Sequence, residues 1–177
     1  MSKSRIILIL AAVLILAVGI YTAVQAAAVK GQKAPNFSAP DLSGRTTSLN
    51  NIRKDPEKNG ATRVVLLDFF ATWCPPCQEE IPHLQKLYDK YRKQGFVIVG
   101  IAGDKDGAKA VKPFVRKYKL TYPLLTDVSG KVQRTYGVRG YPTLYLIDKE
   151  GVIRSTHIGY TPGLERNLEN EIKALLK

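Results

Sequence analysis

The strongest constraint on the fold is an apolar run that leads directly into the only two cysteines of the chain. The run "TRVVLLDFF" (Thr62–Phe70) is continuous and rich in β-branched residues, as in a strand that is covered on both faces. Cys74 and Cys77 follow in "TWCPPCQEE", where a helix is expected to begin. The sequence therefore predicts a buried strand and a helix that meet at a pair of thiols.

The rest of the chain continues this alternation. "GFVIVGIA" (Gly95–Ala102) is the next expected strand, and "GAKAVKPFVRKYKL" (Gly107–Leu120) is expected to be a helix. A short extended piece, a short helix that Gly137 ends, two strands around the turn "KEG" and a closing helix then follow at 122–127, 130–138, 143–148, 152–159 and 161–177. In the closing helix we expect Thr161 as the N-cap and Pro162 at the first helical position. This order predicts an α/β sandwich around a mixed sheet.

Residues 1–29 are expected to be a signal peptide or a membrane anchor. Two basic residues precede an uncharged run that is nearly all apolar over Ile6–Val24, and about 20 such residues span a bilayer. This length favours a retained anchor, whereas "TAVQAAAV" has the small residues of a cleavage site ahead of Ala27. Both alternatives stay open. In either case the basic end stays inside, and residues 30–177 form a domain outside the cytoplasm.

The charge of the chain is basic but scattered. The formal net charge of +12 falls to +9 without the first 30 residues, which leave 24 Lys and Arg against 15 Asp and Glu. The most basic stretch, "KPFVRKYK" (Lys112–Lys119), fits the solvated face of an amphipathic helix. We therefore expect no nucleic-acid binding, but a mild attraction to anionic lipid or an acidic partner.

The cysteine pair is best explained as a redox reagent. A structural metal site needs about four ligands, and besides the cysteines the chain offers only His83 and His157, which we interpret as structural or exposed. A structural disulfide across two residues would restrain the unfolded chain little. A thiol at a helix start is favoured as the reactive thiolate, and a second thiol one turn away can release the bound substrate. No metal or cofactor is expected.

The order strand, "WCPPC", helix and later "GYPT" resembles the thioredoxin superfamily. Further details are similar to the TlpA/ResA-like thiol-disulfide oxidoreductases: the redoxin (AhpC-TSA-like) entry "APNFSAPDLSGRTTSL" (Ala34–Leu49), "CQEEIPHL", and an inserted segment at Gly95–Leu120. The similarity covers roughly Lys33–Lys177. It implies a thioredoxin-like fold, a central mixed β-sheet flanked by helices, with an N-terminal redoxin-type extension and a strand-helix insertion.

The resemblance implies roles for the two cysteines and for three residues near them. Cys74 would be the attacking thiolate, and Cys77, less exposed and inside the helix, would resolve the mixed disulfide. Trp73 would be a flat apolar surface on which a partner docks; the alternative is an ordinary half-buried aromatic residue. Pro142 matches a cis-proline that faces the disulfide, where Tyr141 offers its backbone to an extended substrate. The alternative is a proline that only bounds the next strand.

Two acids are further candidates. Asp68 occupies the place where cytoplasmic thioredoxins carry a buried acid that handles the resolving cysteine's proton; the alternative is a solvated side chain at a sheet edge. Glu80 lies three residues after Cys77 on the same helix face, where TlpA/ResA-like proteins place a functional acid; the alternative is a surface charge. Glu79 is expected at the surface, and Pro82 resembles the family's kink in this helix.

The dipeptide between the cysteines favours a reductase. Oxidising members of the superfamily usually carry a histidine there, whereas Pro75 and Pro76 have no backbone N–H to stabilise the Cys74 thiolate. A less stabilised dithiol is a stronger reductant. The resemblance implies that protein disulfides are the substrates, for example the haem-site cysteines of apocytochrome c. Electrons would come from a membrane protein of the DsbD/CcdA type.

Two other functions are alternatives. The entry segment suggests a peroxiredoxin-like thiol peroxidase, but that chemistry resembles a PxxxTxxC loop, which "DFFATWC" does not match. A Sco-like copper-binding chaperone has a similar scaffold, but it resembles CxxxC with a distant histidine, whereas the spacing here is CxxC.

Overall fold

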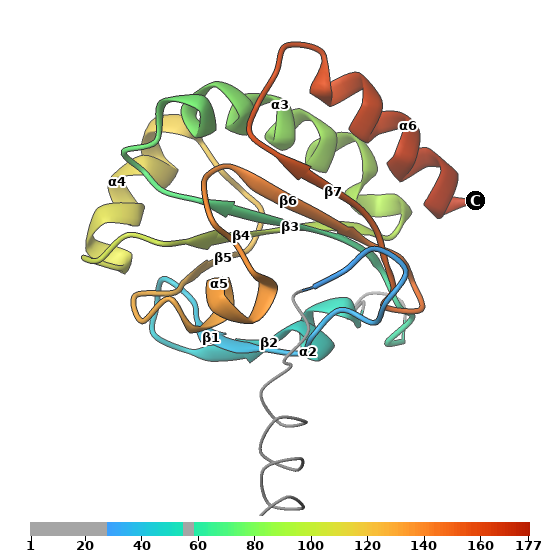
Figure 1. The fold of residues 1–177 in the computed structure, drawn as a ribbon, viewed down its shortest axis with the longest axis horizontal. Helices are drawn as coiled ribbons and strands as arrows, with labels where there is room; N and C mark the ends of the chain where they lie inside the picture. Colours follow the sequence, from blue (N-terminus) through green and yellow to red (C-terminus); the bar gives the residue numbers. More distant parts are fainter. Residues whose placement is uncertain (1–27, 55–58) are drawn as a thin grey trace, which may run out of the picture.

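The computed structural model describes residues 28–54 and 59–177. Residues 1–27, which carry nearly all of the expected signal peptide or anchor, lie outside this part of the chain. Within the described residues, no helix is both long and apolar enough to cross a membrane. Figure 1 shows a central sheet with helices on both faces, as the sequence predicts for an α/β fold.

The central sheet has five strands in the order β5-β4-β3-β6-β7. Their bounds are Val64–Phe70 for β3, Phe96–Ala102 for β4, Leu124–Thr126 for β5, Thr143–Ile147 for β6 and Ile153–Ile158 for β7. The first three run parallel, whereas β6 and β7 are antiparallel to their neighbours. Strand β3 is central and all of its residues are buried, which explains why its sequence is a continuous apolar run. The predicted mixed sheet is confirmed.

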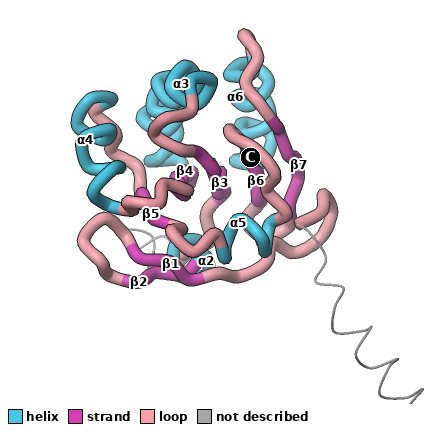
Figure 2. The backbone as a smooth tube through the Cα atoms, turned by 60° about the vertical axis from the view of Figure 1, so that its left-hand side comes forward, coloured by secondary structure: helices cyan, strands magenta, loops and turns pink. Residues whose placement is uncertain are grey.

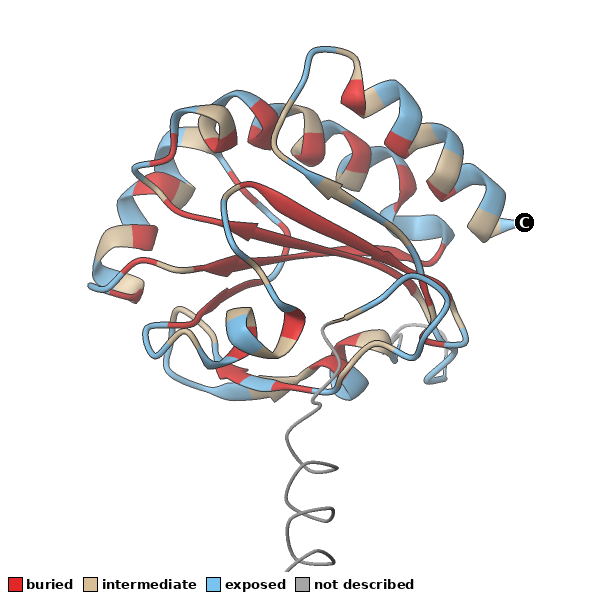
Figure 3. Cartoon of the chain, in the orientation of Figure 1, coloured by how far each residue is buried: buried red, intermediate tan, exposed pale blue. Residues whose placement is uncertain are grey.

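Helices and a hairpin cover the two faces of this sheet. One face carries α3 (Pro75–Tyr91), α4 (Ala108–Tyr118) and α6 (Leu164–Leu176), as the views in Figures 1 and 2 agree. The other face carries α2 (Leu49–Arg53), α5 (Lys131–Tyr136) and the hairpin of β1 (Ser38–Pro40) with β2 (Thr46–Ser48). A 3₁₀ turn, η2 (Arg92–Gln94), follows α3. In Figure 3 the buried residues follow the strands and the inner sides of the helices, so each face has its own apolar core.

The predicted start of the closing helix is wrong. Helix α6 begins at Leu164 and its N-cap is Gly163, whose φ of 93° is left-handed. A residue in that conformation cannot lie inside a right-handed helix, so Thr161 and Pro162 form a turn before it, closed by the Leu164 N–H on the Thr161 carbonyl. By contrast, Gly137 ends α5 in the left-handed conformation, as predicted.

Gly100 in the middle of β4 makes room for the segment that leads into β5. A Cβ atom at this position would lie 2.4 Å from Cδ2 of Leu124, 3.1 Å from Cε1 of Phe70 and 3.3 Å from Cε2 of Tyr122. These side chains therefore occupy the space that any larger residue in β4 would fill. The glycine lets Tyr122 and Leu124 pack directly on the sheet.

We expect Gly100→Ala to destabilise the protein by about 1–3 kcal/mol, because the added methyl group overpacks this part of the core. The measurement is the free energy of unfolding from urea denaturation. Gly140→Ala is the matched control, since no atom lies within 4 Å of a Cβ there and its φ is not left-handed. Equal stability of both variants would mean that the Leu124 side chain moves aside at little cost.

Candidate active site

The two cysteines form a disulfide at the junction of β3 and α3. Cys74 is the N-cap of α3 and Cys77 lies in its first turn, with a Cα–Cα distance of 5.3 Å. Both are buried, and Cys77 is completely so, in agreement with the expected order of exposure. Pro75 and Pro76 fill the first helical positions, where a missing N–H breaks no helical bond. The Cys77 N–H donates to Sγ of Cys74 at 3.3 Å.

The turn before Cys74 is held from three elements. The Asp104 carboxylate, buried in the loop after β4, accepts hydrogen bonds from the N–H and the hydroxyl of Thr72. From α3, the Gln78 amide donates to the Thr72 carbonyl at 2.8 Å, and the Tyr118 hydroxyl of α4 donates to Gln78. Asp104 was not anticipated, although an acid directly after an apolar strand such as β4 is a signal that sequence reasoning can use.

The peptide bond between Tyr141 and Pro142 is cis, as the resemblance implied. The Tyr141 hydroxyl donates to Gln133, and Gly103 leaves the space in which that hydroxyl lies. The Tyr141 ring meets the Trp73 ring edge-on, with 6.0 Å between their centroids. The segment with the cis-proline therefore lies beside the turn that carries Cys74.

An apolar rim, made of Trp73, Tyr141 and Ile158, surrounds this place. Trp73 is 67% exposed, so the alternative of a half-buried aromatic residue is excluded. Ile158 at the end of β7 is 79% exposed and pairs with Thr143, the residue after the cis-proline. Sequence reasoning missed Ile158, although an apolar residue in phase with the outward Arg154 and Thr156 was the signal.

Both candidate acids are buried on the α3 side of the sheet. Asp68 is 0% exposed and Glu80 is 1% exposed, which excludes the alternatives of a sheet edge and a surface charge. Neither carboxyl has a hydrogen-bond partner. Burial raises the pKa of Asp68 to about 7, and burial together with the Asp68 charge raises the pKa of Glu80 to about 9. Glu79 is exposed, as predicted.

The two histidines take part in other contacts. The ring of His83 stacks on Tyr160 with 6.1 Å between centroids, and Nε2 of His157 lies 3.0 Å from the Glu171 carboxylate. Over residues 28–54 and 59–177, no three side chains of His, Cys, Asp or Glu gather in a group that could hold a metal ion. Pro82 lies inside α3, as expected.

This arrangement is suited to disulfide exchange. A sulfur at the helix N-terminus can be held as a thiolate, and its partner is one turn away and can displace whatever the first sulfur binds. Two carboxyls with raised pKa values on the same side of the sheet can take up protons near neutral pH. The exposed rim offers apolar surface to a polypeptide.

Comparisons with known proteins agree with this chemistry. The ResA thiol-disulfide oxidoreductase of Bacillus thuringiensis subsp. konkukian is 41% identical over 123 residues, which are 70% of this chain and 66% of that protein, just under two thirds. The thioredoxin-like protein YneN of Bacillus subtilis is 39% identical over 131 residues, 73% of this chain and 72% of YneN.

A solved structure gives the same result for the fold. The crystal structure of a thiol:disulfide interchange protein, DsbE, from Chlorobium tepidum superposes with a TM-score of 0.75 at 32% identity, over 84% of this chain and 99% of that one. The model of the AhpC/TSA family matches residues 30–156, which include the entry hairpin, the cysteines and most of the central sheet. The chain therefore belongs to the AhpC/TSA family, and the thioredoxin-like resemblance read from "WCPPC" and "GYPT" is confirmed.

Proposed function

We propose that this protein is a thiol-disulfide oxidoreductase that reduces protein disulfides outside the cytoplasm with Cys74 and Cys77. The observation that carries the proposal is the disulfide at the start of α3, which joins the only two cysteines of the chain beside an exposed apolar rim. The names of ResA and DsbE, relatives in sequence and fold, support the same reaction class.

The reaction begins with the reduced pair. The Cys74 thiolate attacks one sulfur of a substrate disulfide, a new S–S bond forms, and the displaced substrate sulfur takes up a proton. Cys77 then gives its proton to a buried carboxylate and attacks Sγ of Cys74. The second substrate sulfur leaves as a thiolate and takes up a proton from water, and the Cys74–Cys77 disulfide of this structure remains. Two electrons have passed to the substrate, and an external dithiol must restore them.

Asp68 and Glu80 are the proposed acceptors of the Cys77 proton. Cys77 is fully buried, so bulk water does not reach its thiol easily. A carboxyl with an ordinary pKa near 4 would be a weak base at pH 7, whereas burial raises the pKa of Asp68 to about 7 and that of Glu80 to about 9. Near neutral pH the pair therefore offers one carboxylate as a base while the other carboxyl keeps its proton. The apolar environment thus makes these acids effective bases for a buried thiol.

The apolar rim is the proposed docking surface. Trp73 and Tyr141 flank the disulfide turn, and Ile158 extends the surface past the cis-proline. An extended, apolar segment with a cysteine fits such a surface better than a charged one. Among partners of this kind, the family resemblance favours the haem-site cysteines of apocytochrome c.

The direction of electron flow follows from the backbone around Cys74. Residues 75 and 76 are prolines and have no backbone N–H. In the first turn of α3, the N–H of Cys77 is therefore the one backbone donor to Sγ of Cys74. Fewer donors leave the thiolate less stable, so the dithiol gives up its electrons more readily. This supports a reductase over an oxidase.

Location and electron supply complete the proposal. The basic and apolar segment at 1–29 acts as a signal peptide or as an anchor to the membrane, and it places residues 30–177 on the outer side. A membrane protein of the DsbD/CcdA type is the proposed electron donor, since the cytoplasmic reductants are then on the other side of the membrane.

A peroxiredoxin-like thiol peroxidase is the second candidate. It is favoured by the entry segment, which forms the hairpin β1–β2 within the part that the AhpC/TSA model matches. Consumption of hydrogen peroxide without a dithiol partner would favour this candidate. The Sco-like copper chaperone has no such support, because His83 and His157 are engaged with Tyr160 and Glu171. Copper titration tests it directly.

The roles of the two sulfurs are tested by serine variants. Cys74→Ser should abolish the reduction of insulin disulfides, because the attacking thiolate is lost. Cys77→Ser should still form a mixed disulfide but should not turn over. In the native host, the complex trapped by Cys77→Ser can be identified by mass spectrometry. Capture by Cys74→Ser and not by Cys77→Ser would reverse the assignment.

The roles of the two acids are tested by Asp68→Asn and Glu80→Gln. Each should slow disulfide exchange near pH 7 by roughly 100-fold or more, because the base that the two acids share is lost. Each should also fold, with a stability relative to wild type that increases with pH. Native pKa values of about 7 for Asp68 and about 9 for Glu80 mean that the wild-type protein loses stability as the pH rises from the unfolded pKa near 4 to these values, and the amides do not ionise.

The pH–rate profile and urea denaturation between pH 5 and 9 measure both effects. Glu79→Gln is the control, because it removes the same charge from the exposed side of α3. If both variants kept the wild-type profile, Asp68 and Glu80 would have no part in the proton transfers.

The two prolines are tested by Pro75→Gly combined with Pro76→His. The change restores two backbone donors and adds a side chain that can carry positive charge beside Cys74. One hydrogen bond to a charged sulfur is worth about 1.5–3 kcal/mol, and roughly 30 mV corresponds to about 1.4 kcal/mol for two electrons. The reduction potential should therefore rise by a few tens of millivolts, measured by equilibration with glutathione.

Pro82→Ala is the control for this experiment, since it also adds an N–H to α3 but lies about two turns beyond Cys74. It should leave the potential unchanged. A double variant that is as reducing as the wild type would show that the prolines do not set the direction of this protein.

A further inference from the structure

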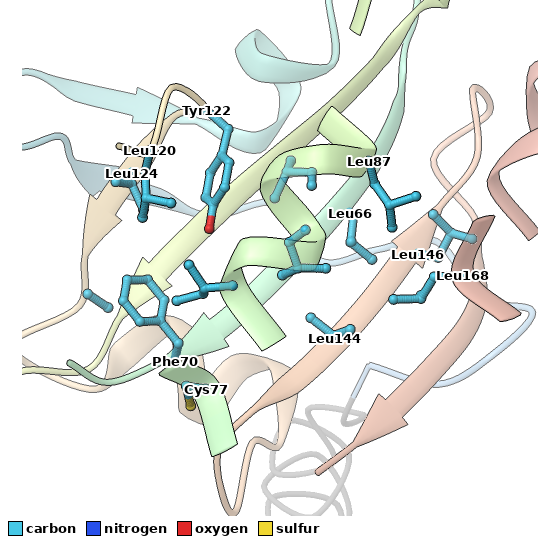
Figure 4. Close-up of a cluster of buried hydrophobic side chains, with 14 of the residues drawn as sticks. Leu66, Phe70, Cys77, Leu87, Leu120, Tyr122, Leu124, Leu144, Leu146 and Leu168 are labelled. Atoms are coloured by element: carbon cyan, nitrogen blue, oxygen red, sulfur yellow. The ribbon is translucent and has the colours of Figure 1, made fainter. Parts of the chain in front are cut away.

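Tyr122 is a buried tyrosine that the proposed reaction does not yet use. It lies between α4 and β5, it is 3% exposed, and its hydroxyl has no hydrogen-bond partner. Buried hydroxyls are nearly always hydrogen-bonded, so such a group calls for an explanation. Figure 4 shows the Tyr122 hydroxyl pointing into the buried cluster on the α3 side of the sheet.

The register of the sheet places this ring beside Asp68. Asp68 of β3 is the partner of Gly100 in β4, and residues paired in this way direct their side chains to the same face. Gly100 has no side chain, and Cε2 of Tyr122 lies 3.3 Å from the position of its missing Cβ. Because neighbouring strands are about 4.8 Å apart, the Tyr122 ring occupies the place next to the Asp68 side chain.

Glu80 completes the group from the α3 side. The ionised forms of Asp68 and Glu80 both raise the pKa of Tyr122, after burial as the main cause, so all three groups share one electrostatic environment. Because the pKa of Tyr122 is raised well above its usual value, its hydroxyl stays neutral and can donate a hydrogen bond. The four carboxyl oxygens of the two acids are also without partners. One donor and four acceptors of this buried group thus lack partners.

The other residues around Tyr122 are aromatic or apolar, so the two acids are the candidate acceptors for its hydroxyl. Tyr88 of α3 packs its ring against Tyr122, with 5.9 Å between centroids. Tyr160, before α6, is the further titratable group that the Glu80 charge affects, together with the charges of Glu165 and Glu79. The side chains of α4 and α6 that are buried in this core are apolar, namely Val111, Phe114, Leu164, Leu168 and Ile172.

In this structure the Tyr122 hydroxyl is bonded to neither acid. We propose that Tyr122 is a positioning residue for disulfide exchange, whose hydroxyl donates a hydrogen bond to a member of the Asp68–Glu80 pair once that carboxyl ionises. The inference rests on the proposed role of these acids. The carboxylate that Tyr122 holds accepts the proton of the Cys77 thiol, and the resulting thiolate attacks Sγ of Cys74. Tyr122 itself loses no proton and forms no covalent bond. Its contribution is to keep one carboxyl ionised near neutral pH while the other retains its proton.

The test is Tyr122→Phe, which keeps the ring and removes the hydroxyl. Without its donor the carboxylate is less stable, so the pair should ionise at a pH about one unit higher than in the wild type. Infrared difference spectra of the carboxyl C=O stretch, recorded on the oxidised protein between pH 5 and 10, measure this midpoint without any activity. The pH–rate profile of exchange should move in the same direction.

Tyr145→Phe is the matched control. It removes a buried hydroxyl on the opposite face of the sheet, where the Tyr145 hydroxyl donates to the Tyr136 carbonyl at 2.6 Å. Both the infrared midpoint and the rate profile should stay at their wild-type values. If Tyr122→Phe does not fold, Tyr122→Leu also removes the donor and should raise the midpoint in the same way.

An unchanged or lowered midpoint in the Tyr122 variant would overturn the proposal, as would an equal shift in Tyr145→Phe. The result is separate from the fate of the proposed function. If the midpoint depends on Tyr122 but the wild-type protein reduces no disulfide, the hydrogen bond stands and the reductase assignment fails. If the wild type reduces insulin and the midpoint ignores Tyr122, only the role of Tyr122 fails.

Discussion

The packing of α3 against the central sheet determines the geometry of the whole site. Strand β3 is buried along its length, and Ile81 and Leu84 of α3 are fully buried in the same apolar cluster as Leu66 of β3. This contact fixes where the helix begins, and therefore where the cysteine pair lies at the edge of the sheet. It also brings Glu80 onto the side of the sheet that Asp68 faces. The reactive sulfurs and the buried acids are thus positioned by the same apolar layer.

That layer also gives the acids their chemistry. An ionised carboxyl without a hydrogen-bond partner is unfavourable in an apolar core, so Asp68 and Glu80 hold their protons to a higher pH than exposed acids do. As a consequence, the folded state is less stable above neutral pH than it would be with acids of ordinary pKa. In the proposed reaction, the benefit is a carboxylate that can accept the Cys77 proton near pH 7. Stability and activity therefore depend on the same buried charge.

Local patterns predicted most of the fold, whereas one error arose from a single local conformation and another from contacts between distant segments. The run Thr62–Phe70 identified β3 because a strand buried on both faces needs continuous apolar residues. The start of α6 was misplaced because Gly163 takes a left-handed conformation that the preceding "TP" does not reveal. Tyr122 was missed because its place depends on Gly100, a residue of another strand. Helix α2 was not predicted, because its five residues are too few to show a helical hydrophobic period.

The site separates two properties that a dithiol reagent must adjust. How strongly the pair holds its electrons depends on hydrogen-bond donors close to Sγ of Cys74. Pro75 and Pro76 have no N–H, so the Cys77 N–H is the backbone donor that remains there. How fast Cys77 resolves a mixed disulfide depends on a proton acceptor, and the proposed acceptors are side chains in the core between α3 and the sheet, Asp68 from β3 and Glu80 from α3 itself. Because the donor is a backbone N–H and the acceptors are core side chains, a change in the dipeptide should alter the potential without removing the base. Substitutions in the core would alter the rate and leave the donors of the helix start in place.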